Sequence, residues 1–182
     1  MIMKRLFTFI LIIFLTSNLI ASEREDKLDI LFEKLKKSLD ATSKTEQEIW
    51  SLWITHPSDN NLTIKLEEGS ILMQRQQLEG AISIFTEVIK LDPSWAEAWN
   101  KRATAYYMVG EFQKSQDDID QVLKIEKRHF GALAGQGMVN IQLKNYEKAL
   151  DSYKKVQEIH PSMKSPKIMI KEIQEFIKNQ SI

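Results

Sequence analysis

Small and apolar residues recur at intervals of 34 positions along the C-terminal two thirds of this 182-residue chain. Each column keeps a similar size and polarity through three successive positions. The columns are Gly69, Ala103 and Gly137; Leu78, Phe112 and Tyr146; Ala81, Ser115 and Ala149; Phe85, Ile119 and Tyr153; Val88, Val122 and Val156; Leu91, Ile125 and Ile159; and Pro93, Lys127 and Pro161. A fixed period of this length indicates stacked copies of one supersecondary unit. We therefore predict three units, over residues 62–95, 96–129 and 130–163.

Within each unit the apolar spacing predicts two helices. The larger apolar residues follow one another at i, i+3 and i+4, which is the spacing of one helix face. In the middle unit, Ser94 and Glu97 form a capping-box pattern that predicts the start of the first helix. Gly110 predicts the end of that helix, and Phe112 opens a second helix that reaches about Glu126. The predicted fold class is all-α, an α-solenoid of antiparallel helix pairs.

The segments on either side of the three units are also predicted to be helical. Two apolar stripes precede the units, and they predict a helical pair within residues 23–60, a degenerate unit that we expect to stack on the first full one. The stripes are Leu28, Leu31, Phe32, Leu35 and Leu39, then Ile49, Trp50, Trp53 and Ile54. After the units, Ser165 and Pro166 predict the N-cap and first position of a last helix within residues 164–182. A stacked array needs such a helix to cap its last repeat.

The first 22 residues have the three parts of a secretory signal peptide. Lys4 and Arg5 precede an apolar run over residues 6–15, and small residues end the segment at Ala21 and Ser22. We therefore predict cleavage after Ala21 or Ser22 and export of the protein to the periplasm. The alternative is an uncleaved anchor in the inner membrane, although residues 6–21 fall short of the ~20 that a spanning helix needs.

Composition and charge exclude several classes of function. The chain has no cysteine, so it can form no disulfide, thiolate zinc site, iron–sulfur cluster or cysteine nucleophile. Its 25 basic and 25 acidic side chains give none of the basic surplus that nucleic-acid binding requires. Without the leader, 23 basic and 25 acidic side chains remain, because Lys4 and Arg5 are its only charged residues. We expect no cofactor.

No arrangement in the sequence predicts catalysis. The histidines His56, His129 and His160 fall in predicted turns without metal-ligand spacing, so we expect exposed turn residues rather than a metal site. The acidic run of Asp117, Asp118 and Asp120 fans around a helix and predicts a solvated outer face. Three glycines from Gly131 to Gly137 lack the strand and the Lys-Ser/Thr of a phosphate-binding loop. We therefore expect no enzyme activity and no catalytic residues.

The repeated columns resemble the tetratricopeptide repeat (TPR), a helix–turn–helix unit of 34 residues. The middle unit matches most of its signature positions, namely Trp99, Ala103, Tyr106, Gly110, Phe112, Ser115 and Val122. Departures are Lys127 at the usual terminal proline and Asn140 at a usual aromatic position. With its leader, the chain is similar to short signal-peptide-bearing TPR proteins of Gram-negative bacteria. Such proteins serve as adaptors for secretion, outer-membrane assembly or cell-wall enzymes.

The resemblance implies a concave groove, lined by the first helix of each unit, that binds another protein or a peptide. The implied groove residues are Thr63, Glu67, Ser70, Gln74, Glu97, Asn100, Lys101, Thr104, Tyr107, Gly131, Ala134, Gly135, Met138 and Gln142. The small side chains of the third unit predict a shallow bay beside Tyr107 for an apolar or aromatic side chain. Chaperone-binding members grip a terminal carboxylate with cations at positions that here hold Leu66, Ser70, Lys101, Gly131 and Gly135. Only Lys101 is a cation, which argues against carboxylate capture.

Two functions follow from these features. The first is an exported protein-interaction adaptor that holds a peptide or helix of an envelope protein in the groove. The alternative is a self-associating structural protein, a homodimer or larger oligomer, in which Trp50 and Trp53 form an apolar patch. Membrane contact is expected only through an uncleaved leader.

Overall fold

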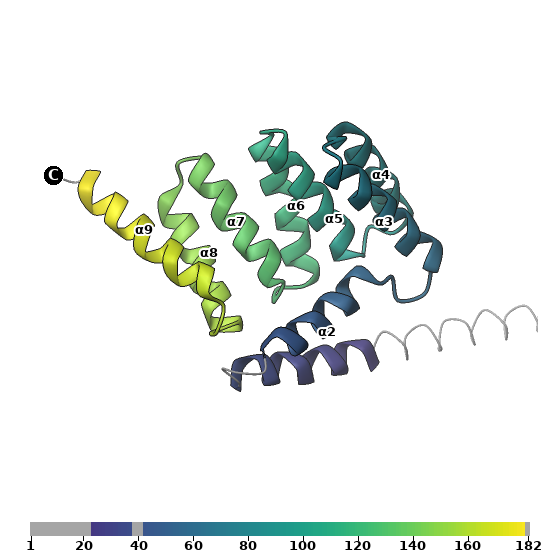
Figure 1. Cartoon of the computed structure of the whole chain (residues 1–182), viewed down its shortest axis with the longest axis horizontal. Helices are drawn as coiled ribbons and strands as arrows, with labels where there is room; N and C mark the ends of the chain where they lie inside the picture. Colours follow the sequence, from purple (N-terminus) through teal and green to yellow (C-terminus); the bar gives the residue numbers. More distant parts are fainter. Residues whose placement is uncertain (1–22, 38–41, 181–182) are drawn as a thin grey trace, which may run out of the picture.

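A computed structural model describes residues 23–37 and 42–180, and it consists of helices joined by short turns (Figure 1). The predicted leader and residues 181–182 lie outside the described residues. The first helix covers residues 23–37, and the others are α2 (Thr42–Ile54), α3 (Asn60–Gln74), α4 (Leu78–Leu91), α5 (Ala96–Met108), α6 (Phe112–Ile125), α7 (Phe130–Gln142), α8 (Tyr146–Ile159) and α9 (Lys164–Gln180). No strand occurs over these two ranges. The predicted all-α solenoid is confirmed.

Helices α3 to α8 form three hairpins that stack side by side, and α9 packs on the last of them (Figure 1). The small residues of the 34-residue columns lie where the two helices of a hairpin meet. A Cβ atom on Gly69 would lie 2.5 Å from the Phe85 ring, and Ser115 Oγ donates a hydrogen bond of 2.7 Å to the Ala103 carbonyl. These positions therefore allow the close approach that sets the spacing of the stack.

The turn inside each hairpin has the same backbone conformation in all three units. Gln76, Gly110 and Lys144 adopt φ angles of 60°, 83° and 61° at positions 34 residues apart. In each turn the next backbone N–H bonds a carbonyl five residues back, as Glu111 N does to Tyr106 O at 2.9 Å. This is the left-handed cap that commonly ends helices. The predicted end of α5 at Gly110 is confirmed.

The N-terminal helical pair, residues 23–37 and α2, does not extend the stack. It lies along the edge where the turns between successive units gather, which we call the turn edge (Figure 1). Its apolar stripes pack on the start of α7 and the end of α8, through Phe130, Leu133 and Val156. The expectation that the pair stacks on the first unit is therefore wrong, because its apolar residues are used against the third.

Helix α9 covers the last hairpin, with Ile173 in one cluster with Ala149 and Tyr153. It begins at Lys164, so Pro166 is its third residue and the expected capping role of Ser165 is wrong. None of the described helices is both long enough and apolar enough to span a membrane.

The tight contact at Gly137 generates the first testable prediction. A Cβ atom there would lie 2.6 Å from the Tyr153 ring, whereas one on Gly135 would meet nothing closer than 3.6 Å. We expect Gly137→Ala to lower the free energy of unfolding by about 1–3 kcal/mol through overpacking. The matched variant Gly135→Ala should raise it by about 0.5–1 kcal/mol. Urea unfolding measures both values, and equal effects would contradict the packing described.

Candidate functional site: the pocket between α5 and α7

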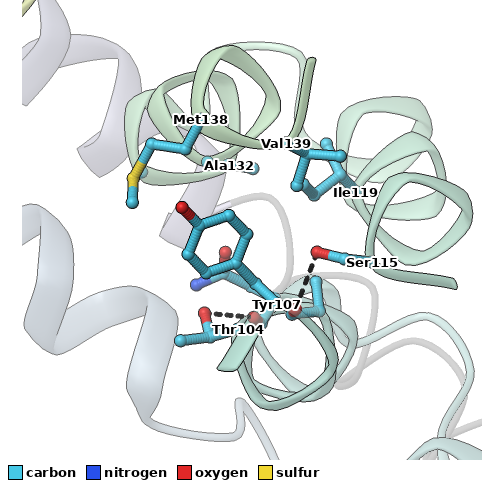
Figure 2. A pocket seen from close by; sticks show the side chains of 11 residues that line it. Thr104, Tyr107, Ser115, Ile119, Ala132, Met138 and Val139 are labelled. Carbon is cyan, nitrogen blue, oxygen red and sulfur yellow. Dashed lines mark hydrogen bonds between the residues drawn. The ribbon is translucent and has the colours of Figure 1, made fainter. Parts of the chain in front are cut away.

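A cavity of about 90 Å³ opens between α5 and α7, with α6 behind it (Figure 2). Its lining residues are Asn100, Ala103, Thr104, Tyr107, Ser115, Ile119, Gly131, Ala132, Gly135, Met138 and Val139. Six of these belong to the predicted groove: Asn100, Thr104, Tyr107, Gly131, Gly135 and Met138. The structure thus brings together the bay that the sequence predicts beside Tyr107.

The polar groups of this pocket are already partnered, which leaves an apolar interior. Ser115 Oγ donates to the Ala103 carbonyl, and Thr104 Oγ1 donates to the Asn100 carbonyl at 3.0 Å. Ile119 and Val139 form buried walls, while the Met138 side chain is 43% exposed at the rim, beside the Tyr107 ring (Figure 2). Such a lining suits an apolar side chain and offers no activated nucleophile.

The glycines of α7 differ in what surrounds them. A Cβ atom on Gly131 would lie 2.6 Å from the Trp50 ring of α2, and one on Gly137 would lie 2.6 Å from Tyr153. At Gly135 the nearest atom is Ile119 Cδ1 at 3.6 Å, an ordinary contact distance. Packing therefore requires glycine at positions 131 and 137 but not at 135, where the missing side chain leaves the pocket open.

One end of the predicted groove is covered by the N-terminal helical pair. Glu97 is 1% exposed, and its Oε2 accepts a hydrogen bond from His129 Nε2 at 3.1 Å. Gly131 lies under Trp50, and Ala134 packs against the core that the pair shares with α7. The expectation that these three residues are free to contact a partner is therefore wrong.

The remaining predicted groove residues lie outside the pocket. Lys101 Nζ is 3.4 Å from the buried Glu97 Oε1, so its charge is paired within the molecule. On α3, Ser70 Oγ donates to the Leu66 carbonyl at 2.8 Å, and Thr63 Oγ1 accepts from the His56 backbone N–H at 2.9 Å. Glu67, Gln74 and Gln142 are exposed.

The three histidines are buried rather than exposed, contrary to the sequence-based expectation. His56, His129 and His160 are 8%, 0% and 2% exposed. Each ring places Nε2 beside a carboxylate: Asp92 at 2.8 Å, Glu97 at 3.1 Å and Glu46 at 3.2 Å, respectively. The described residues contain no group of three or more side chains arranged to hold a metal ion. The histidines therefore belong to the turn edge.

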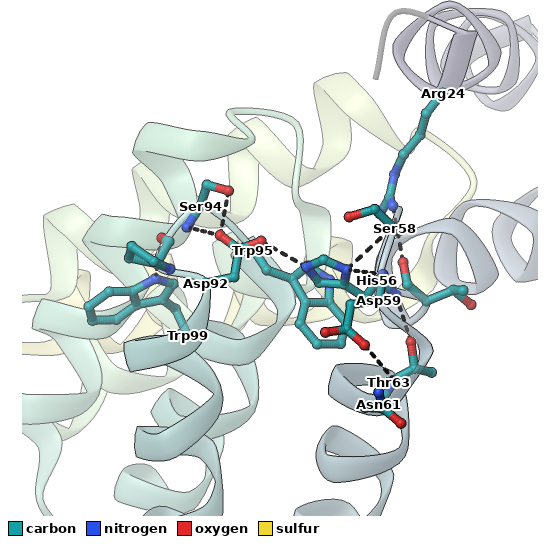
Figure 3. A network of polar contacts seen from close by, with 12 residues as sticks. Arg24, His56, Ser58, Asp59, Asn61, Thr63, Asp92, Ser94, Trp95 and Trp99 are labelled. Atoms are coloured by element: carbon teal, nitrogen blue, oxygen red, sulfur yellow. Dashed lines mark hydrogen bonds and ion pairs between the residues drawn. The ribbon is translucent and has the colours of Figure 1, made fainter. Parts of the chain in front are cut away.

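Hydrogen bonds to Nδ1 fix the tautomer of two of these histidines. The Asp59 backbone N–H donates to His56 Nδ1 at 2.9 Å, and the Ala132 backbone N–H donates to His129 Nδ1 at 3.1 Å (Figure 3 for His56). Because a backbone N–H can only donate, each Nδ1 lacks a hydrogen and each Nε2 donates its own to the carboxylate. Burial raises the pKa of Asp92, but hydrogen bonds from Ser94 and His56 outweigh it and the net pKa is lowered.

The same contacts overturn the predicted capping box. Ser94 Oγ donates to Asp92 Oδ1 at 2.6 Å, and α5 starts after Trp95 without a side-chain cap. His129 supplies the corresponding cap of α7. No periodic pattern marks His129 as a cap, although its position one residue before the apolar start of α7 is a local signal that could have identified it.

One residue of the acidic run is also buried. Asp118 is 4% exposed and forms two hydrogen bonds of 2.8 Å with Arg102, which also donates to Thr86 Oγ1 at 3.0 Å. Burial raises the pKa of Asp118, and the hydrogen bond with Asp118 raises the pKa of Arg102. Asp117 and Asp120 are exposed as expected.

Comparison with known proteins identifies the family. The family described as "TPR repeat" matches residues 69–110, and the family described as "Tetratricopeptide repeat" matches residues 131–163. A TPR repeat-containing protein of Rhizobium etli is 31% identical over 144 residues, which are 78% of this chain and 70% of that protein. The chain belongs to the tetratricopeptide repeat family. It is a TPR protein–protein interaction module, a class that is typically non-catalytic.

Other TPR proteins match over part of their length. Tetratricopeptide repeat protein 12 of Mus musculus is 31% identical over 99 residues, 54% of this chain but only 14% of that protein. The Arabidopsis OM64 TPR domain superposes with a TM-score of 0.61 at 23% identity, covering 63% of this chain and 95% of that domain. The first TPR of Spaghetti (RPAP3), bound to an HSP90 peptide of sequence SRMEEVD, has a TM-score of 0.63 at 20% identity, covering 64% and 93%. The structural likenesses establish the TPR fold.

The ion pair of Arg102 and Asp118 generates a second prediction. Replacing Arg102 with Met leaves a buried carboxylate without its partner, and we expect the free energy of unfolding to fall by about 3–5 kcal/mol. The double variant Arg102→Met, Asp118→Leu should recover most of that loss. Urea unfolding of the three proteins checks this, and a single-variant loss below about 1 kcal/mol would indicate a solvated pair in solution.

Proposed function

We propose that this TPR protein is an exported adaptor that binds a peptide or helix of an envelope protein through one aliphatic side chain placed in the α5–α7 pocket. The observation that carries the proposal is Gly135. A glycine inside a helix costs roughly 0.5–1 kcal/mol relative to alanine, and here no close contact requires it. The absence of a side chain at Gly135 instead keeps an apolar pocket open.

The size of the pocket favours an aliphatic anchor over an aromatic one. Its volume is about 90 Å³, smaller than the engineered cavity of about 150 Å³ that accepts benzene. Because the N-terminal helical pair covers the start of α7, the accessible surface is limited to the later turns of α5 and α7. A short segment with one buried residue fits this surface better than a long peptide.

The site differs from one that captures an acidic C-terminal tail. The HSP90 peptide in the RPAP3 complex contains two glutamates and ends in aspartate. In this chain the positions that the family uses for cations hold a buried Leu66, an internally bonded Ser70 and two α7 glycines. Lys101 is paired with Glu97. These features support a partner recognised by apolar contact rather than by carboxylate charge.

The pocket is tested by site-directed crosslinking in cells. A photo-crosslinking residue at Thr104, exposed on the pocket rim, should capture one specific protein, which mass spectrometry identifies. Gly135→Leu should reduce that product at least about tenfold, because the leucine occupies the anchor site. Lys124→Leu introduces the same residue on the exposed surface of α6 and should leave the product unchanged.

Two outcomes would reject the pocket as the contact surface. One is an equal yield of the product from Gly135→Leu and from the unaltered protein. The other is an equal loss in Lys124→Leu. Circular dichroism of the purified variants must show unaltered helical content, so that a loss reflects a filled pocket and not unfolding.

Export is a separate part of the proposal and rests on the sequence of residues 1–22. Deletion of residues 2–22 should retain the protein in the cytoplasm, whereas the full chain should fractionate with the periplasm at the mass of residues 22–182 or 23–182. Cell fractionation with immunoblotting and mass spectrometry measures both. Recovery of the full-length mass in the inner membrane would indicate an uncleaved anchor instead.

A further inference from the structure

The two ends of the TPR stack present apolar side chains to solvent. At one end, Ile64 and Ile71 of α3 are 51% and 40% exposed, seven residues apart on the side of the helix opposite its buried residues. At the other end, Ile168 of α9 is 56% exposed. Helices α3 and α9 lie at opposite ends of the stack (Figure 1). The N-terminal helical pair covers neither face, because it packs along the turn edge.

The self-association predicted from the sequence needs a different surface from the one expected. Trp53 is only 4% exposed, and its ring stacks on His129 with centroids 3.9 Å apart. Trp50 makes edge contacts with Phe130 and covers Gly131. The two tryptophans therefore form an internal contact and provide no patch for another molecule, whereas Ile64, Ile71 and Ile168 are available.

Formal charge changes steadily from one end of the stack to the other. The first unit, residues 62–95, has three basic and five acidic side chains. The middle unit has six of each, and the third unit has four basic and three acidic side chains. Helix α9 has four lysines against two glutamates. The stack is thus acidic at the α3 end and basic at the α9 end.

The charges accompany the exposed isoleucines on both end helices. On α3, Glu67 and Glu68 are exposed within one turn of Ile64 and Ile71. On α9, Lys167 and Lys171 are exposed on either side of Ile168 in sequence. Lys171 has a 3.8 Å ion pair with Glu175, but both side chains remain more than half exposed. The two faces are complementary in charge and alike in having an apolar centre.

We propose that copies of this chain associate head to tail, with α9 of one copy on the outer face of α3 of the next. A second copy is the occupant that the chain itself supplies with the required charge and apolar side chains. Because the two faces differ, the contact is heterologous and leaves one free face of each kind on every assembly, so chains grow stepwise unless a ring closes. Screening weakens the attraction as salt rises.

Analytical ultracentrifugation tests this on protein purified after expression of the full-length chain. The mean mass should rise with protein concentration at low salt, and association should weaken at least about tenfold in about 0.5 M NaCl. Ile71→Lys alters the α3 face, and Lys167→Glu with Lys171→Glu alters the α9 face. Each variant alone should be monomeric, because one of its two faces no longer matches.

A mixture of the two variants distinguishes this contact from any other. Each variant retains the face that the other has lost, so an equimolar mixture should form a one-to-one dimer and stop there. Ile125→Lys changes an exposed isoleucine of α6 away from both ends and should associate like the unaltered protein. Gly135→Leu should also associate normally, since the α5–α7 pocket plays no part.

The proposal is overturned if the unaltered protein stays monomeric at every concentration, including when an end face captures some other protein. It is also overturned if either end variant associates like the unaltered protein, or if the mixture yields no one-to-one dimer. Circular dichroism of each variant confirms folding before these masses are compared. None of these outcomes bears on the pocket, which Thr104 crosslinking tests separately.

Discussion

The close approach of the two helices in each hairpin is the constraint on which the rest of this structure depends. Gly69 against Phe85 and Gly137 against Tyr153 place an aromatic ring where a side chain on the facing helix would otherwise be. In the middle hairpin the Ser115 hydroxyl bonds the Ala103 carbonyl instead. Three chemically different contacts thus keep one helix spacing, and a common spacing lets the three hairpins stack in a single register.

The turn edge converts this stack into an asymmetric molecule. The buried rings of His129 and His160 hold carboxylates from α5 and α2, and the tryptophans of α2 pack on the start of α7. These contacts fix the N-terminal helical pair on one edge, where it covers Glu97 and Gly131. Because one end of the groove is occupied from within, partner contact is restricted to the pocket between α5 and α7. The internal cover therefore determines the size of ligand that the module can accept.

The sequence predicted what depends on local periodicity and missed what depends on distant pairing. Helices α3 to α9, the small-residue contacts and the bay beside Tyr107 follow from spacings within one or two turns or one repeat. The partners of the buried histidines do not, since His129 and Glu97 are 32 residues apart and His160 and Glu46 are 114 apart. Asp118 looked solvated because its partner Arg102 lies on another helix. The left-handed turns at Gln76 and Lys144 were missed because neither residue type favours a positive φ.

The glycines of α7 show how a structure separates packing from function where a sequence cannot. In sequence, Gly131, Gly135 and Gly137 are three small residues on one helix. In the structure, two of them face aromatic rings within 2.6 Å of an added Cβ atom, and the third faces open space beside Ile119. A glycine that neither a turn nor a contact requires retains the helix-destabilising cost without a compensating gain in packing. Residues that lower stability without a structural reason are expected at functional sites, and Gly135 is such a residue.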